Sequence, residues 1–327
     1  MTLKLSIGAS DCDRIRPLID GAVTIDGVEA RWHVHGVQQL FNEQCTHHTY
    51  DAAEFPLATY LRDLEGARRY LALPVFPSRH FRFSCVFVNK AAGLKSPADL
   101  AGKRVGIPIW DMAAAVWLRG IFEEHHGLDM RAPVYVTNGL EFGRTADEHP
   151  QAYPGGFEII HASDDGGLAK MLADGKIEAL YTAGAPSTYD PHDPDCPVTR
   201  LFDDPVAAET AYYQNTGIFP PMHIFALKRE IAEANPGLTR RLYAALCDAQ
   251  REARARLFNS AALNVMLPWL FDHLLESERR LGADYWAAGF AANRKTLETV
   301  IDYMRNEGLL TTDLTAGDMF DADMRAT

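Results

Sequence analysis

Two arginines and a histidine stand in the stretch Pro77 to Phe83, PSRHFRF, directly before an apolar run that is typical of a buried strand. Burying an unpartnered cation costs far more free energy than the burial of one apolar side chain returns. These groups therefore either reach solvent or meet an anion. A guanidinium offers a planar fork to a carboxylate and also lies well on an aromatic face, so Arg79 and Arg82 suit an aromatic acid.

The alternative for this stretch is that one of the arginines pairs with an acid of the protein itself. Strand alternation would place His80 and Arg82 on one face, and Arg79 with Phe81 on the other. Both arginines can therefore touch one ligand only if the segment is looped, and the proline at position 77 favours a loop.

His223 is a second candidate, in the motif TGIFPPMH. The two prolines impose an extended, non-helical approach, which suits a loop beside a ligand. A histidine with a pKa of about 6.5 can donate a proton at neutral pH. The alternative is a core histidine that is hydrogen-bonded to backbone.

Polar residues also follow the first expected strands. Ser10, Asp11 and Asp13 come after one strand, and Glu54 comes after YDAA. An acid in such a loop can accept a proton from a ligand, although a salt bridge or simple solvation is the better explanation for each acid singly. Asp111 opens an expected helix, whose first N–H groups suit a carboxylate, but ordinary N-capping explains Asp111 too.

The twelve histidines raise the question of a metal site. His33 and His35 share a strand face, and residues 47–48 and 125–126 are adjacent histidine pairs. Zinc sites need three or four convergent ligands, and the sequence has no C-x-x-C, H-x-x-x-H or H-E-x-x-H pattern. We therefore expect no metal; a metal held by separated loops stays open.

Strand-like and helix-like segments alternate along the chain. Leu3, Leu5 and Ile7 alternate as in a strand, whereas Val37 to Thr46 has helical spacing. Ser96-Pro97-Ala98-Asp99 predicts a helix that begins at residue 97. Further helices are expected from Ala113 to Phe122, capped by Asp111 and stopped by Gly127, and from Gly167 to Ala173; a strand is expected at 224–227.

The order of these segments predicts two lobes. A first α/β block is followed by a second block that opens near residue 92, and the chain then returns with a long helical tail. We expect lobe 1 to comprise 1–91 and 205–327, and lobe 2 to be the inserted 92–204. Such lobes close by hinge motion on a ligand held at the carboxyl ends of strands.

Composition limits the partners and the compartment. The chain has 327 residues, 47% of them apolar, and a net charge of −12, which argues against nucleic acid as a partner. No run approaches the roughly 20 apolar residues of a membrane-spanning helix. Five widely spaced cysteines and the lack of an export signal predict a cytoplasmic protein. A homo-oligomer is left open.

Several segments, taken together, resemble the 4,5-dihydroxyphthalate decarboxylase family. PSRxFR with TGIFPxMH is the specific part of the resemblance, whereas LAGKRVGIP occurs widely among solute-binding proteins. The other matching segments, in chain order, are MAAAVWLRGIFEEHHGLD, TNGLEFGR, MLADGKIEALYTAGAPS and ANRKTLETVIDYMRNEGLL.

The resemblance implies the two-lobed fold of type 2 periplasmic solute-binding proteins, in which a mixed sheet flanked by helices forms each lobe and a ligand cleft separates them. It also implies non-oxidative decarboxylation of 4,5-dihydroxyphthalate to 3,4-dihydroxybenzoate and carbon dioxide, without an organic cofactor. The fold hosts many functions. A binding protein for a small aromatic carboxylate and a different lyase are therefore the alternatives.

The resemblance also suggests roles for individual residues. His223 would protonate the ring carbon, Arg79 and Arg82 would hold the diacid, and His80 or an acid would assist the phenol. In the family the residue between the arginines is often apolar, position 184 is often arginine rather than glycine, and a serine-rich run often replaces AEFPLATY. The expected substrate-binding residues are Ser10, Asp11, Glu54, Phe81, Asp111, Met112, Thr182, Thr216 and Phe219.

Overall fold

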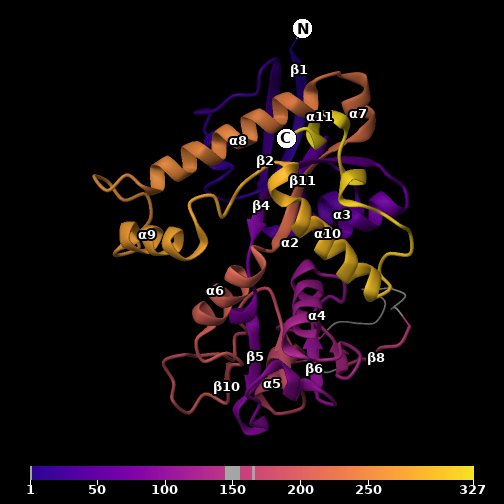
Figure 1. Cartoon of the computed structure of the whole chain (residues 1–327), viewed down its shortest axis with the longest axis vertical. Helices are drawn as coiled ribbons and strands as arrows, with labels where there is room; N and C mark the ends of the chain where they lie inside the picture. Colours follow the sequence, from indigo (N-terminus) through magenta and orange to yellow (C-terminus); the bar gives the residue numbers. More distant parts are fainter. Residues whose placement is uncertain (1, 144–154, 164–165) are drawn as a thin grey trace. The chain divides into compact units, whose positions relative to one another are not determined.

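The structure is a computed structural model that describes residues 2–143, 155–163 and 166–327. The chain forms two compact units, each with its own sheet (Figure 1). Unit 1 comprises Met1–His80, Thr216–Ile301 and Thr312–Thr327, and unit 2 comprises Phe81–Asn215 and Asp302–Thr311.

Unit 1 contains a five-stranded sheet in the order β2-β1-β3-β11-β4. Its strands are β1 (Leu3–Ser10), β2 (Val28–His35), β3 (Ala52–Pro56), β4 (Tyr70–Arg79) and β11 (Pro221–Lys228). β1 is parallel to β2 and β3, whereas β11 is antiparallel to both β3 and β4. The carboxyl ends of β1, β2 and β3 therefore lie at one edge of the sheet.

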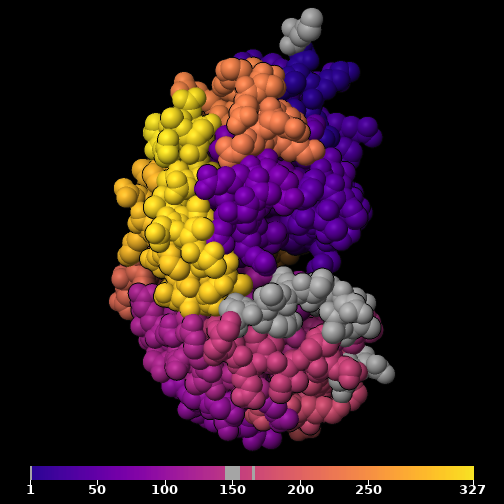
Figure 2. Space-filling view, turned by 90° about the vertical axis from the view of Figure 1, so that its right-hand side faces the viewer, coloured from indigo at the N-terminus to yellow at the C-terminus, as the bar shows by residue number. Residues whose placement is uncertain are grey.

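Helices pack around this sheet. Those of unit 1 are α1 (Arg16–Ile19), α2 (Val37–Phe41), the π-helix η1 (Asn42–Thr46), α3 (Leu57–Glu65), α7 (Arg229–Ala234), α8 (Leu238–Leu257), α9 (Leu270–Leu281), α11 (Ala322–Arg325) and most of α10 (Phe290–Asn306). The C-terminal residues, yellow in Figure 2, lie against the purple segment that contains α3, and the hydroxyl of Tyr60 donates to the carbonyl of Met319.

Unit 2 contains a six-stranded sheet in the order β10-β5-β9-β6-β7-β8. Its strands are β5 (Val86–Asn89), β6 (Arg104–Ile107), β7 (Val134–Thr137), β8 (Glu158–His161), β9 (Ala179–Tyr181) and β10 (Val198–Arg200), and its main helices are α4 (Ala113–His126), α5 (Gly167–Ala173) and α6 (Pro205–Thr216). α4 is buried along ten consecutive residues, and its Arg119 forms a fully buried ion pair with Glu307 at 2.6 Å.

Local sequence signals account for several of these elements. A 3₁₀-helix (Pro97–Leu100) begins where expected, and the carboxylate of Asp99 accepts a hydrogen bond from the N–H of Ser96 at 2.8 Å. α5 has the expected bounds, and Gly127 ends α4 in the left-handed conformation.

The expected N-cap of α4 is corrected. Met112, not Asp111, is the N-cap, because Met112 still has an extended backbone with φ −64° and ψ 136°. The side chain of Asp111 is instead buried before the helix begins.

The boundaries of the units also differ from the expected 92 and 204. Unit 2 begins at Phe81 because β5 pairs with β9 and β10 in the second sheet. It extends through α6 to Asn215 and regains Asp302–Thr311, where Glu307 meets Arg119. None of the helices in the described part of the chain is long and apolar enough to cross a membrane.

Candidate functional site

Ser10, Glu54 and His223 form a hydrogen-bonded cluster in unit 1. One carboxylate oxygen of Glu54, Oε2, accepts hydrogen bonds from the backbone N–H of Ser10 at 3.0 Å and from its hydroxyl at 2.5 Å. The other oxygen, Oε1, lies 2.5 Å from Nδ1 of His223. Because an ionised carboxylate only accepts, Nδ1 carries the proton of this bond.

Strand pairing accounts for the convergence of these residues. β1 runs parallel to β3 with Gly8 opposite Ala53, so the end of β1 brings Ser10 beside Glu54. β11 runs antiparallel to β3 with His223 opposite Pro56, two residues beyond Glu54. Residues two apart in a strand share a face, so Glu54 reaches His223 diagonally across the ladder.

An irregularity in the ladder accompanies His223. The register between β11 and β4 shifts on both sides of this residue, between Pro221 and His223 and again before Phe225. Proline has no N–H to donate, so the prolines at 74, 77, 220 and 221 prevent a regular ladder here. Bulges of this kind re-aim side chains, and they are frequent beside active sites.

The environment keeps Glu54 ionised although its side chain is only 1% exposed. Burial raises the pKa of Glu54, but the hydrogen bond and the charge of His223 and the two bonds from Ser10 outweigh burial and hold the pKa below its usual value. The result is a buried carboxylate fixed against one nitrogen of an imidazole.

His223 is held on one side and accessible on another. Its side chain is 14% exposed, and the ring of Phe41, at the end of α2, meets it edge-on with the ring centroids 4.8 Å apart. Glu54 orients the ring through Nδ1, which leaves Nε2 as the nitrogen that can exchange a proton with a ligand. The cluster is therefore an oriented acid–base group.

Arg79 lies at the end of β4, buried within unit 1. Its guanidinium donates to the carbonyls of Phe219 at 2.8 Å and Ala287 at 3.1 Å and to the side-chain oxygen of Asn293, and it lies over the ring of Phe76. These contacts fix the segment before His223 to the C-terminal helical region. Contacts of Arg79 with a ligand stay a prediction.

Arg82 belongs to unit 2 and follows the end of β4, so the segment is looped, as two ligand-facing arginines would require. Its backbone is left-handed with φ +75°, a conformation that costs a non-glycine residue about 1–2 kcal/mol. Its side chain is buried and donates to the carbonyl of Ala183 at 2.6 Å. Backbone strain of this kind clusters at functional sites.

The remaining predicted residues of unit 1 have structural contacts. The backbone N–H of His80 donates to Pro220, and the ring of Phe219 meets Trp286 edge-on at 5.4 Å. The hydroxyl of Thr216 accepts from the N–H of Ile218. Asp11 is exposed and pairs with Arg16, so the structure does not bring it to the cluster.

The predicted residues of unit 2 are mostly buried. Phe81 packs edge-on against Tyr212 and Tyr213, and Asp111 and Thr182 are buried at the ends of loops. Met112 is half-buried at the start of α4. A Cβ added at Gly184 would meet no atom within 4 Å.

Two residues that contact the proposed site residues were not predicted. Phe41 contacts His223, and Asn293, only 4% exposed, accepts from Arg79. Nothing local in the sequence indicates either contact, because the partners lie more than a hundred residues apart in the chain.

The histidines singled out for metal binding have other neighbours. His35 is hydrogen-bonded to the hydroxyl of Tyr50 at 2.8 Å, and His48 to that of Tyr70 at 2.8 Å. His126 packs against Phe122. Within residues 2–143, 155–163 and 166–327, no group of three or more histidine, cysteine, aspartate or glutamate side chains is arranged to hold a metal ion.

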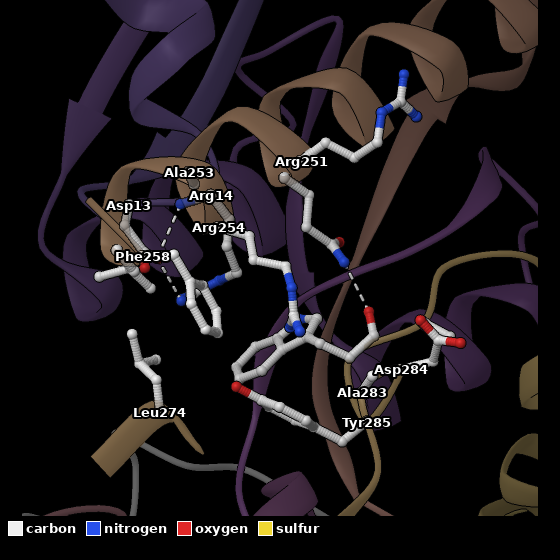
Figure 3. Close-up of a pocket in the computed structure, with 14 residues that line it drawn as sticks. Asp13, Arg14, Arg251, Ala253, Arg254, Phe258, Leu274, Ala283, Asp284 and Tyr285 are labelled. Atoms are coloured by element: carbon white, nitrogen blue, oxygen red, sulfur yellow. Dashed lines mark hydrogen bonds and ion pairs between the residues drawn. The ribbon is translucent and has the colours of Figure 1, made fainter. Parts of the chain in front are cut away.

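A pocket of about 240 Å³ lies elsewhere in unit 1, among α8, α9 and the segment Ala283–Ala287 (Figure 3). Arg254 reaches from α8 toward the ring of Tyr285, and Arg14 pairs with Asp13. The carbonyl of Ala287 accepts from Arg79, so the pocket wall also supports that arginine. Its cations already pair with acids, which makes the Glu54–His223 cluster the better candidate for chemistry.

Comparison with solved structures supports the fold class. The periplasmic aliphatic sulphonate binding protein SsuA of Escherichia coli is similar with a TM-score of 0.55 at 14% identity, covering 97% of this chain and 92% of that one. The alkanesulfonate-binding protein SsuA of Xanthomonas axonopodis pv. citri has a TM-score of 0.52 at 14% identity, covering 97% and 98%. This chain therefore has a periplasmic-binding-protein-like fold, as expected.

Comparison with proteins of known sequence identifies the family. No model of a protein family matches the chain. A 4,5-dihydroxyphthalate decarboxylase of Comamonas testosteroni is 34% identical over 319 residues, which cover 97% of this chain and 96% of that protein. One of Pseudomonas putida is 35% identical over 213 residues, covering 65% and 82%. The chain belongs to the 4,5-dihydroxyphthalate decarboxylase family.

Proposed function

We propose that this protein is a carboxy-lyase that converts 4,5-dihydroxyphthalate to 3,4-dihydroxybenzoate and carbon dioxide. The observation that carries the proposal is the 34% identity to the Comamonas testosteroni decarboxylase, because it extends over 97% of the chain. The Ser10–Glu54–His223 cluster supports it, since this reaction needs a positioned proton donor.

His223 is the proposed proton donor. In its charged form the ring donates from Nδ1 to Glu54, and the proton on Nε2 passes to the ring carbon that bears the departing carboxylate. The bond between that carbon and the carboxylate then breaks, carbon dioxide leaves, and the electron pair restores aromaticity. The partial exposure of His223 gives it access to solvent for reprotonation.

Glu54 and Ser10 are proposed positioning residues. Rate enhancement requires the site to favour the charge distribution of ring protonation over the bound dianion. A buried carboxylate beside Nδ1 fixes the tautomer and the orientation of the imidazole, and Ser10 fixes the carboxylate through two hydrogen bonds. Arginines alone would bind the dianionic substrate but would supply no proton donor.

Both arginines are proposed to bind the substrate, and Arg79 is also proposed to position His223. We propose that Arg79 and Arg82 bind the carboxylates of the substrate, supported by the affinity of guanidinium groups for planar anions. Arg79 also holds the carbonyl of Phe219, four residues before His223, and thereby positions the proton donor. Assistance to the phenol by His80, and the absence of a cofactor, are parts of the same proposal.

A cytoplasmic location is proposed as well. All five cysteines lie in the described part of the chain, and none of them forms a disulfide there. Burial raises the pKa of Cys12 and Cys247. Cysteines that form no disulfide are typical of reducing compartments. Fractionation of cells that express the protein from its own gene would place it with a cytoplasmic marker, and recovery with a periplasmic marker would contradict this.

The function is tested by incubating the purified, metal-stripped protein with 4,5-dihydroxyphthalate. We expect the ultraviolet spectrum to change to that of 3,4-dihydroxybenzoate as carbon dioxide is released in equal amount. A raised melting temperature with unchanged substrate would indicate binding without catalysis. No turnover and no shift of the melting temperature would contradict the substrate assignment.

A further inference from the structure

Residues 259–281 form an arm at the end of α8 that exposes an unusual amount of apolar surface. The arm consists of a loop, 259–269, followed by α9, and in Figure 1 it extends from the end of α8 that lies away from α7. All residues from Ala261 to Trp269 are exposed. The large exposed apolar side chains are Leu263, Val265, Met266, Leu267, Trp269, Phe271 and Leu275.

The apolar side chains of the arm are concentrated rather than scattered. Met266 is 105% exposed and Trp269 is 74% exposed. Elsewhere in the described part of the chain, exposed large apolar residues stand singly or in pairs, at positions 34, 37, 142, 160 and 206. Single exposed apolar residues are normal, whereas a contiguous patch of more than a few hundred Å² marks an interaction surface.

Packing within unit 1 holds the arm in place. Leu270 is buried, Phe258 meets Phe271 edge-on with ring centroids 6.0 Å apart, and Arg254 of α8 pairs with Glu278 of α9. Leu274 of α9 lines the pocket beside Phe258 (Figure 3). Leu270, Leu274 and one edge of Phe271 therefore anchor α9, while Leu275 and the remaining surface of Phe271 stay exposed to solvent.

We propose that the arm is a self-association surface on which α9 packs antiparallel against α9 of a second copy of this chain. Phe271, Leu275 and Arg279 are exposed and four residues apart, so they form one stripe along the helix. A twofold axis near the middle of α9 brings Leu275 against Leu275 of the second copy. Phe271 then lies near the arginines at the opposite end.

The charges along α9 match this arrangement. Asp272 lies in the first turn, and Arg279 and Arg280 lie in the last. Hydrogen bonds from these two arginines to Glu276 lower the pKa of Glu276 to about 2, so one carboxylate serves two cations. In the antiparallel pair Asp272 lies beside Arg279 of the second copy, and the two helix dipoles oppose each other favourably.

A second copy fits the arm better than a membrane surface does. Helices that lie in a membrane interface carry many lysines and arginines on their polar face. Residues 259–281 contain three acids, Asp272, Glu276 and Glu278, against two arginines, and the whole chain has a net charge of −12. An anionic bilayer would repel this surface. In a twofold pair, by contrast, each end of α9 lies beside the oppositely charged end of the second copy.

The proposal is tested by light scattering during size-exclusion chromatography at about 50 μM protein, where micromolar association is visible. We expect a mass of at least twice the 36.3 kDa of one chain. The double variant Met266→Asp/Leu275→Asp should reduce the mass at least twofold while the circular dichroism spectrum stays unchanged. The control is Val206→Asp, which alters an exposed apolar residue on α6 and should leave the mass unchanged.

A charge exchange tests the antiparallel register. Asp272→Arg and Arg279→Asp should each raise the Kd of association by about tenfold, and the double variant should restore it. A wild-type mass of 36.3 kDa, or an unchanged mass in Met266→Asp/Leu275→Asp, would overturn the proposal. Co-sedimentation of a monomeric wild-type protein with phosphatidylglycerol vesicles would also overturn the proposal, because the arm would then be a membrane-binding surface.

Discussion

Glu54 and His223 show how two residues of ordinary type become an acid–base pair. Either residue alone has a plain structural explanation, a solvated acid or a core histidine. Their 2.5 Å contact, with Glu54 1% exposed, changes what both can do. The Glu54 carboxylate is a fixed negative charge beside Nδ1. The electrostatic interaction of such a charge with its neighbours is strong where water is excluded.

Replacing Glu54 with glutamine should reduce kcat without preventing folding. The amide keeps the shape of the side chain and an oxygen that accepts from Ser10, but it places no negative charge beside Nδ1 of His223. We expect kcat to fall by about 10²- to 10⁴-fold with KM changed much less, as for loss of general acid catalysis. Steady-state kinetics with 4,5-dihydroxyphthalate over a range of pH would measure this.

A matched control for this variant lies in the same sheet. Asp51 accepts hydrogen bonds from the N–H and the hydroxyl of Ser6 at 2.8 and 2.9 Å, as Glu54 does from Ser10. Asp51→Asn should therefore perturb a similar serine contact and leave kcat near the wild-type value. Equal losses of kcat in the two variants would show that Glu54 acts only through the fold.

The depressed pKa of Glu54 predicts a specific loss of stability in acid. A carboxyl group whose pKa is lower in the folded state contributes stability above its unfolded pKa, about 4.3 for glutamate, and loses it as pH falls through the folded value. Thermal unfolding between pH 7 and pH 3 should therefore depend less steeply on pH in Glu54→Gln than in the wild type. Parallel curves of Tm against pH would contradict the lowered pKa.

The residue types of the candidate site could be predicted from the sequence, but their contacts could not. Ser10, Glu54 and His223 were predicted to lie in loops, whereas they lie in β1, β3 and β11. Glu54 and His223 are also 169 residues apart in the chain. Arg79 was predicted to meet an anion, and its hydrogen bonds to neutral carbonyl and amide oxygens within unit 1 were not predicted. Tertiary pairing alone decides such contacts.

At the scale of elements, α4 of unit 2 illustrates tight packing around a glycine. A Cβ added to Gly120 would lie 2.2 Å from the ring of Tyr303, which is buried. No real Cβ contact is that short, so the two segments approach closely only because the residue is glycine.

Gly120→Ala should destabilise the protein. Alanine is the better helix former by about 1 kcal/mol. Overpacking against Tyr303 costs about 1–3 kcal/mol, and displacement of the Tyr303 ring increases this cost. Urea unfolding should show a lower midpoint. Gly184→Ala is the control, because position 184 has open space and should show no change. A higher midpoint in Gly120→Ala would contradict the close packing.

Elements with local signals were predicted well, and irregular ones were not. The capping sequence at Ser96, the bounds of α5 and the stop at Gly127 follow from side chains that bond their own backbone or allow a left-handed residue. The π-helix η1 and the register shifts around His223 depend on neighbouring strands. Short-range patterns carry no information about them.

For the whole molecule, the order of α/β blocks predicted two units but not all of their boundaries. The return of Asp302–Thr311 to unit 2 depends on the buried pair of Glu307 with Arg119, formed across 188 residues of chain. The negative net charge predicts neither the fold nor the arm. The arm, too, was not predicted, because its apolar residues read in sequence like part of a core.

The central claim is that this chain decarboxylates 4,5-dihydroxyphthalate with His223 as the proton donor. The most direct test is the rate of carbon dioxide release from this substrate by the wild type and by His223→Ala, each shown to be folded by its melting temperature. The account predicts turnover by the wild type and a rate lower by at least about 10²-fold in the variant, as expected for loss of a general acid. Equal rates in the two proteins, or no release by the wild type, would contradict it.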